Sequence, residues 1–162
     1  MPNVIDWTVD RLLSGVRTLN ARAESAQNTI RANRARYLET LRSLPAVTDV
    51  EAREALRTRL REWIRRQVTV ENRFNSFASN YLAAKSAVKR FLQGAGVSPP
   101  GYLGAGPIVI PAAVYGGLTI AFAVLATIVA VNASLTKSLD QIAGVLKLAR
   151  DRNWTAAEPG EA

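Results

Sequence analysis

Apolar and small residues recur near the start of the chain with alternating spacings of three and four residues. The series comprises Val9, Leu12, Val16, Leu19, Ala23, Ala26, Ile30, Asn33 and Tyr37, and it then drifts to Leu41 and Leu44. A mean spacing of about 3.5 residues is typical of the seam along which coiled-coil helices pack. Asp6 is a suitable helix cap, and Pro45 cannot continue a helix. The pattern therefore predicts a helix over about residues 6–44.

A second seam of the same kind begins a few residues later. Thr48 and Glu51 have the spacing of a capping box, in which each side chain binds a free backbone N–H of the other residue. The seam comprises Leu56, Leu60, Trp63, Gln67, Val70, Phe74, Phe77, Tyr81, Ala84, Val88 and Phe91. Gly94 and Gly96 end the pattern, which predicts a helix over about residues 49–93. Most of the helix–helix packing is expected from its large side chains, Leu56, Leu60, Trp63, Phe74, Phe77 and Tyr81.

Two long helices joined by about four residues most simply form an antiparallel hairpin. The same seams would also serve helices that pair between copies of the chain, and the sequence does not separate these two arrangements. We favour a coiled-coil-like hairpin over residues 1–93 in an all-α fold, with self-association through the surface that stays exposed.

Residues 108–131 read IVIPAAVYGGLTIAFAVLATIVAV, and no charged residue occurs from Phe91 to Thr136. A helix needs about 20 apolar residues to cross a hydrocarbon core about 30 Å thick, so residues 108–132 are predicted to form a single transmembrane helix. The alternative is the buried helix of a soluble core, which a chain of 162 residues can hardly surround.

The segments on either side of this span have different compositions. Residues 94–107 are rich in glycine and proline and are predicted to be a linker. Residues 134–152 place leucine and isoleucine on one face and charges elsewhere, as expected for a short amphipathic helix that lies on the membrane or extends the span. Residues 153–162 are predicted to be a disordered tail.

Small residues recur along the span at four-residue spacing. Such rows let helix backbones approach closely in lipid, where packing drives association. The alternative is that alanine and glycine are simply common in spanning helices. The candidate packing residues of the span are Ala113, Gly117, Ala121, Ala126 and Ala130.

The net charge of +8 belongs to the N-terminal region. Residues 1–90 hold 17 Lys and Arg against 9 Asp and Glu, and the remainder is neutral. Four arginines stand at four-residue spacing on one helix stripe, where their mutual repulsion would be relieved by an anionic partner. They are Arg53, Arg57, Arg61 and Arg65. The partner would be lipid headgroups or nucleic acid. Binding to nucleic acid would lack sequence specificity, because no nucleic-acid-binding motif accompanies the row. The alternative is that the row is an ordinary solvated helix face.

The chain contains no cysteine and no histidine, which excludes thiolate sites and nucleophile–base pairs built on them. No carboxylate pair stands in an apolar context, and no charge falls inside the span. We therefore expect no catalytic residue, metal site, cofactor or small-molecule substrate, and a protein that is not an enzyme.

Basic residues flank the span on both sides, so the positive-inside rule does not decide its orientation. The N-terminus lacks the pattern of a secretory signal. Because moving a short tail across a membrane is easier than moving a long basic region, the N-terminal region is expected on the cytoplasmic or interior side.

Three functions agree with these features. The first is a structural or scaffolding subunit of a membrane-associated assembly, such as a virion or a bacterial envelope complex, with the bilayer and other copies or proteins as partners. The second is a membrane-permeabilising or translocator protein of holin-like type. The third is a membrane-tethered adaptor for nucleic acid or anionic lipid.

Overall fold

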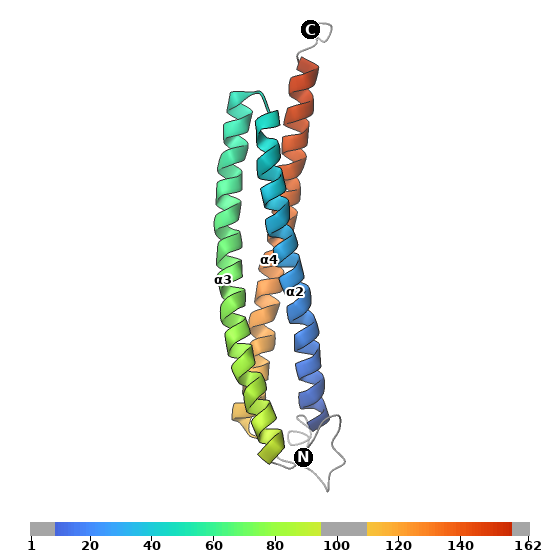
Figure 1. Ribbon diagram of the computed structural model, residues 1–162, viewed down its shortest axis with the longest axis vertical. Coiled ribbons are helices and arrows are strands. Elements are labelled where there is room, and N and C mark those ends of the chain that lie inside the picture. Colours follow the sequence, from blue (N-terminus) through green and yellow to red (C-terminus); the bar gives the residue numbers. More distant parts are fainter. Residues whose placement is uncertain (1–8, 95–109, 157–162) are drawn as a thin grey trace. The chain divides into compact units, whose positions relative to one another are not determined.

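The computed structural model describes residues 9–94 and 110–156, with side chains as far as Asp151. In these residues the fold is all-α, as the sequence predicts, and Figure 1 shows its three long helices. They are α2 (Val9–Ser43), α3 (Val50–Gly94) and α4 (Ala112–Ala156), and a short 3-10 turn, η1 (Leu44–Ala46), follows α2.

The chain divides into two compact units, and every helix contributes a segment to each of them. Unit 1 comprises Met1–Ala26 and Arg73–Ile128, and unit 2 comprises Gln27–Asn72 and Val129–Ala162.

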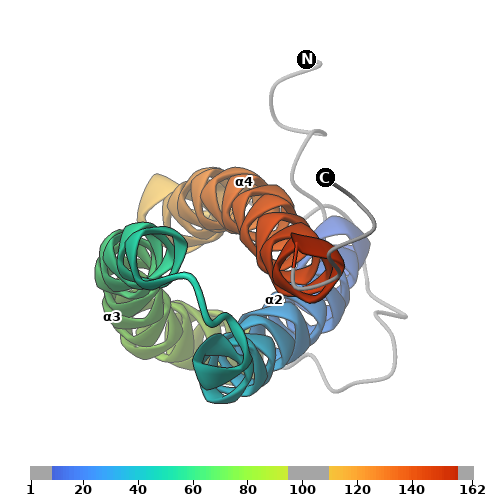
Figure 2. The ribbon, with the colours of Figure 1, turned by 90° about the horizontal axis from the view of Figure 1, so that it is seen from above.

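The connection between α2 and α3 lies in unit 2, and Figure 2 looks down on it. Pro45 stands in the first turn of η1, where a missing N–H costs little, and the Val47 N–H donates to Leu44 O at 3.0 Å. The cap of α3 is Asp49, whose Oδ1 accepts from the Glu51 N–H at 3.1 Å. The predicted capping box at Thr48 is therefore wrong by one residue. A carboxylate at this position both accepts the free N–H and carries the charge that the helix N-terminus favours.

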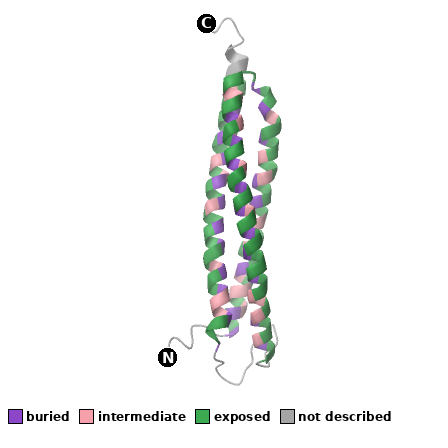
Figure 3. Cartoon of the chain, turned by 90° about the vertical axis from the view of Figure 1, so that its left-hand side faces the viewer, coloured by how far each residue is buried: buried purple, intermediate pink, exposed green. Residues whose placement is uncertain are grey.

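The core of unit 2 is a stripe of buried residues from all three helices and the turn (Figure 3). On every helix these residues follow the three–four spacing of a coiled-coil seam. They are Ile30, Asn33 and Thr40 on α2, Leu44 and Val47 in the turn, Leu56, Leu60, Trp63, Gln67 and Val70 on α3, and Asn132, Leu135, Leu139, Ile142 and Leu146 on α4.

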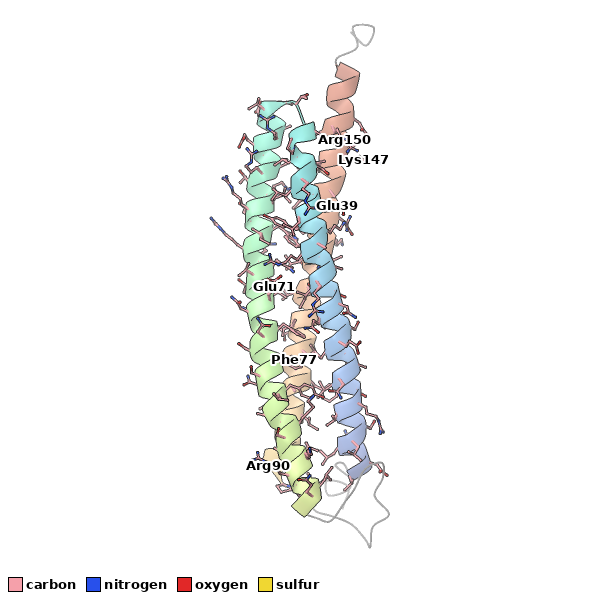
Figure 4. All side chains as sticks on the ribbon, in the orientation of Figure 1. Glu39, Glu71, Phe77, Arg90, Lys147 and Arg150 are labelled. Atoms are coloured by element: carbon pink, nitrogen blue, oxygen red, sulfur yellow. The ribbon has the colours of Figure 1, made fainter. Side chains whose placement is uncertain are left out.

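Unit 1 is built by the same rule. Its buried residues are Val9, Leu12, Leu19 and Ala26 on α2, Phe74, Phe77, Tyr81, Val88 and Leu92 on α3, and Val114, Leu118, Ala121, Leu125 and Ile128 on α4. The side chain of Phe77 is labelled in Figure 4. The six large α3 residues expected to pack are thus buried, three in each unit.

The α2 seam differs from its prediction near the end of the helix. Thr40 is buried, whereas Leu41 is 37% exposed. The spacing of three from Tyr37 is kept, so the seam does not drift. Thr40 can be buried because its hydroxyl donates to Arg36 O of its own helix at 2.8 Å.

The predicted span and amphipathic helix form one continuous helix, α4, so the second segment extends the first, which is one of the two arrangements that the sequence allowed. Neither proline nor glycine stands between Val131 and Lys137, so nothing in the sequence breaks the helix there. The helix begins at Ala112, after Pro111, and residues 153–156 of the predicted tail belong to it. The predicted cap Asp6, linker residues 95–107 and tail residues 157–162 lie outside the described residues.

Candidate membrane-anchoring helix and its packing surfaces

Among the described residues, α4 is the one helix long and apolar enough to cross a membrane. The qualifying stretch is Ala112–Asp151, and the mean hydropathy of its most apolar 18-residue window is 2.2. Only 28% of that window is buried. The other residues of the window are half-buried or exposed, so this helix keeps an uncharged face that the rest of the chain leaves uncovered.

The covered face of α4 in unit 1 makes close contacts at two glycines. A Cβ atom added to Gly117 would lie 3.2 Å from the Ala84 Cβ of α3, closer than ordinary van der Waals contact. A Cβ atom added to Gly15 of α2 would lie 3.8 Å from atoms of both Leu118 and Phe122. Gly117 thus allows an approach between α4 and α3 that even an alanine would force apart by a few tenths of an ångström.

Polar groups of unit 1 join α3 to α2. The Tyr81 hydroxyl has one proton to donate and two acceptors within reach, Val16 O at 2.9 Å and Asn20 Oδ1 at 2.7 Å. Burial raises the pKa of Tyr81 to about 12, so this hydroxyl remains a donor at neutral pH. One contact to α4 involves charge, since the Arg22 guanidinium carbon lies 5.6 Å from the Phe122 ring centroid, within cation–π range.

The small residues predicted to pack along the span do not share one face. Ala121 is buried and Gly117 is half-buried, whereas the others are exposed; these are Ala113, Ala126 and Ala130. Ile120 is 65% exposed on the same outer surface. The two threonines of the span direct their hydroxyls to their own helix, Thr119 to Tyr115 O at 3.0 Å and Thr127 to Ala123 O at 3.1 Å.

In unit 2 each helix contributes one amide side chain to the buried seam: Asn33, Gln67 and Asn132. Asn33 Nδ2 donates to Asn132 Oδ1 at 3.2 Å and to Thr136 Oγ1 at 2.9 Å. Gln67 Nε2 donates to Ile30 O at 2.9 Å. Gln67 Oε1 is buried without a hydrogen-bond partner among the described residues, which costs stability. Polar residues in a seam favour one register over its alternatives at such a cost.

Trp63 of α3 touches both other helices of unit 2. Its ring stacks on Tyr37 of α2, with centroids 5.4 Å apart and an angle of 14° between the planes. Its indole N–H donates to Leu135 O of α4 at 2.8 Å. An exposed ion pair between Arg36 and Asp140 also joins α2 to α4.

A bidentate ion pair connects α2 to α3 in the same unit. The Arg34 guanidinium donates to both Glu71 carboxylate oxygens at 2.7 Å. Glu71 is labelled on α3 in Figure 4. The hydrogen bonds from Arg34 lower the pKa of Glu71 below its ordinary value, and a bond from Gln67 acts in the same direction. The pKa of Arg34 is raised by the same pair.

The four arginines predicted to contact an anionic partner lie on α3 in unit 2. Arg53 Nη1 donates to Val47 O at 3.3 Å, and Arg57 pairs with Glu54 one turn before it. Arg61 and Arg65 are exposed. The row is therefore partly used for local contacts, and its second half faces solvent.

Within residues 9–94 and 110–156, no group of three or more acidic residues is arranged to hold a metal ion. Comparison with known proteins gives no match, since no family model, curated protein or solved structure is similar to this chain.

Proposed function

We propose that the chain is a non-enzymatic helical scaffold that α4 attaches to a lipid bilayer, and that it is a structural subunit of a membrane-associated assembly such as a virion or bacterial envelope complex. The observation that carries this proposal is the uncharged outer face of α4 between Ala112 and Val131, which the rest of the chain leaves uncovered. A helix at the surface of a soluble bundle carries polar and charged residues on its outer face. Here that face presents Ile120 and Val124 instead.

Transfer energies decide which part of the chain enters lipid. Residues 112–131 contain nine Leu, Ile, Val and Phe residues. At about 0.3–0.6 kcal/mol each, they favour insertion by roughly 3–5 kcal/mol. The α2 and α3 segments of unit 1, residues 9–26 and 73–94, contain nine charged residues, and carrying all of them into hydrocarbon would cost roughly 20–30 kcal/mol. The hairpin therefore stays in water, and we place it on the cytoplasmic or interior side.

A holin-like pore has less support. A water-filled lumen needs polar groups along the lining helix, and the hydroxyls of Thr119 and Thr127 are directed to carbonyls of α4 itself. An adaptor role is compatible with the scaffold, because the exposed Arg61 and Arg65 remain available to anionic headgroups.

Alkaline carbonate extraction of membranes from expressing cells tests the proposal, combined with protease protection of intact vesicles. We expect the protein to stay in the membrane pellet, with residues 1–90 digested and the tail beyond Val131 shielded. Ile120→Arg should shift the protein to the extract because it places a charge on the uncovered face of α4. Leu82→Arg is the matched control, since Leu82 on α3 is 61% exposed and Ile120 is 65% exposed. Full extraction of the unaltered protein would contradict the membrane role.

A further inference from the structure

The packed arrangement of α4 and a transmembrane arrangement exclude each other. In unit 1 one face of α4, which includes Leu118, Leu125 and Ile128, is buried beside α2 and α3 segments that hold nine charged residues. In unit 2 the residues that follow the apolar stretch pack against the same hairpin. If α4 crosses a bilayer, its two ends lie on opposite sides, so its second half can no longer contact a hairpin that remained with the first.

We propose that the structure is the pre-insertion state of α4, in which the hairpin holds the future span until lipid replaces it. This inference rests on the proposed membrane function and adds a step that determines when α4 inserts. Release and insertion of α4 are one two-state equilibrium, and lipid shifts it by binding the released helix better than the packed helix.

The contacts of the chain fall into two sets that fit this device. One set joins α2 to α3 without α4: the Arg34–Glu71 ion pair and the bonds from Tyr81 to α2. The hairpin keeps these contacts when α4 leaves. It therefore remains a folded element on the water side in both states.

The other set holds α4. In unit 1 the contacts at Gly117 and Gly15 are apolar, and hydrocarbon can replace them at little cost. In unit 2 the contacts are polar, through Asn33 to Asn132 and Trp63 N–H to Leu135 O. These hydrogen bonds hold the half of α4 that must cross the bilayer. Breaking them is the step that commits α4 to insertion.

A disulfide between α3 and α4 tests the device directly, because the chain has no cysteine of its own. Ala84→Cys/Gly117→Cys places two Cβ atoms 3.2 Å apart, so the helices must move apart by a few tenths of an ångström to reach the separation of about 3.5–4.5 Å usual in disulfides. Ala84→Cys/Gly116→Cys is the matched control, because a Cβ added to Gly116 has nothing within 4 Å. Each full-length protein is incubated, oxidised or reduced, with phosphatidylcholine–phosphatidylglycerol vesicles, and the carbonate-resistant fraction is measured after flotation.

We expect oxidation of the Ala84–Gly117 variant to lower the inserted fraction about tenfold, and reduction to restore it, while the control is unaffected. Equal insertion of the oxidised and reduced forms would overturn the pre-insertion device and leave the membrane function standing. Failure of the reduced protein to insert would overturn the membrane function itself. Failure of the disulfide to form under oxidation would show that α4 is not held at Ala84.

A second pair of variants acts in the opposite direction. Gly117→Leu and Gly116→Leu add the same apolar side chain to the span, but only the first collides with Ala84. Gly117→Leu should therefore insert faster, by about fivefold or more, because it destabilises only the packed state. Equal insertion rates for the two variants would contradict the device.

Discussion

Replacing Trp63 by phenylalanine tests whether three helices hold unit 2 together in solution. Trp63 is buried on α3, stacks on Tyr37 of α2 and donates its indole N–H to Leu135 O of α4. Phenylalanine keeps a ring to stack on Tyr37 but has no donor and a smaller side chain. The substitution therefore removes the hydrogen bond to α4 and leaves most of the stacking on α2.

The cost has two parts. Losing one hydrogen bond destabilises by about 0.5–1.5 kcal/mol net. The carbon atoms lost with the second ring contribute about another 1–2 kcal/mol through lost burial and the space left behind. We expect Trp63→Phe to lower the free energy of unfolding by roughly 2–3 kcal/mol, and Trp63→Ala, which also loses the stacking, by roughly 3–5 kcal/mol.

Urea titration of the lipid-free, full-length chain measures this loss, with helix content followed by circular dichroism and extrapolated to water. Val68→Ala is the control because Val68 lies on the same helix in the same unit and is 40% exposed. It should change the free energy of unfolding by no more than about 0.5 kcal/mol. A Trp63→Phe protein as stable as this control would refute the packing of Trp63 against α4.

Two further predictions concern the polar groups of unit 2. Asn33→Leu leaves the buried Asn132 carbonyl without its donor and should cost about 1–3 kcal/mol, whereas Asn33→Leu/Asn132→Leu removes both groups and should recover most of that loss. A double variant no more stable than Asn33→Leu, in the same urea assay, would argue against this pairing. The pKa of Glu71 is lowered in the folded protein, so its stabilising contribution is full above the unfolded carboxyl pKa of about 4.3 and disappears as pH falls through the lower folded pKa. Urea midpoints of the unaltered protein should therefore fall more steeply below about pH 4.3 than those of Glu71→Gln, and parallel pH profiles would exclude the ion pair as the cause.

The seams of α2 and α3 could be predicted from spacing because polar residues separate their apolar positions. Leu56 and Phe77, for example, stand out against charged or small neighbours, and both are buried where the three–four pattern places them. The pattern failed where hydrophobicity and spacing disagreed. Leu41 is more apolar than Thr40, but the spacing puts Thr40 inside, and its hydroxyl can be satisfied by its own helix.

The buried amide side chains of unit 2, Asn33, Gln67 and Asn132, could be predicted only in part. Asn33 and Gln67 fall on the predicted seams, so their burial follows from spacing. Their partners do not, because Asn132 is 99 residues from Asn33 along the chain. Helix periodicity specifies which face a residue occupies but not which residue of another helix lies opposite. The bond from Trp63 to Leu135 O was hidden for the same reason.

The first half of the α4 seam, within the predicted span, was missed for a different physical reason. Buried positions from Val114 to Leu146 keep the three–four spacing throughout, but between Ala112 and Val131 the intervening positions are apolar or small as well. Periodicity is visible only against polar neighbours, so uniform composition concealed the pattern until charges resume at Lys137. One stretch of sequence thus carries the requirements of a bundle helix on one face and of a lipid-facing helix on all faces. Composition alone does not choose between these two environments. The charged hairpin can pack against α4 in water but cannot follow it into hydrocarbon, so α4 can occupy only one of the two environments at a time.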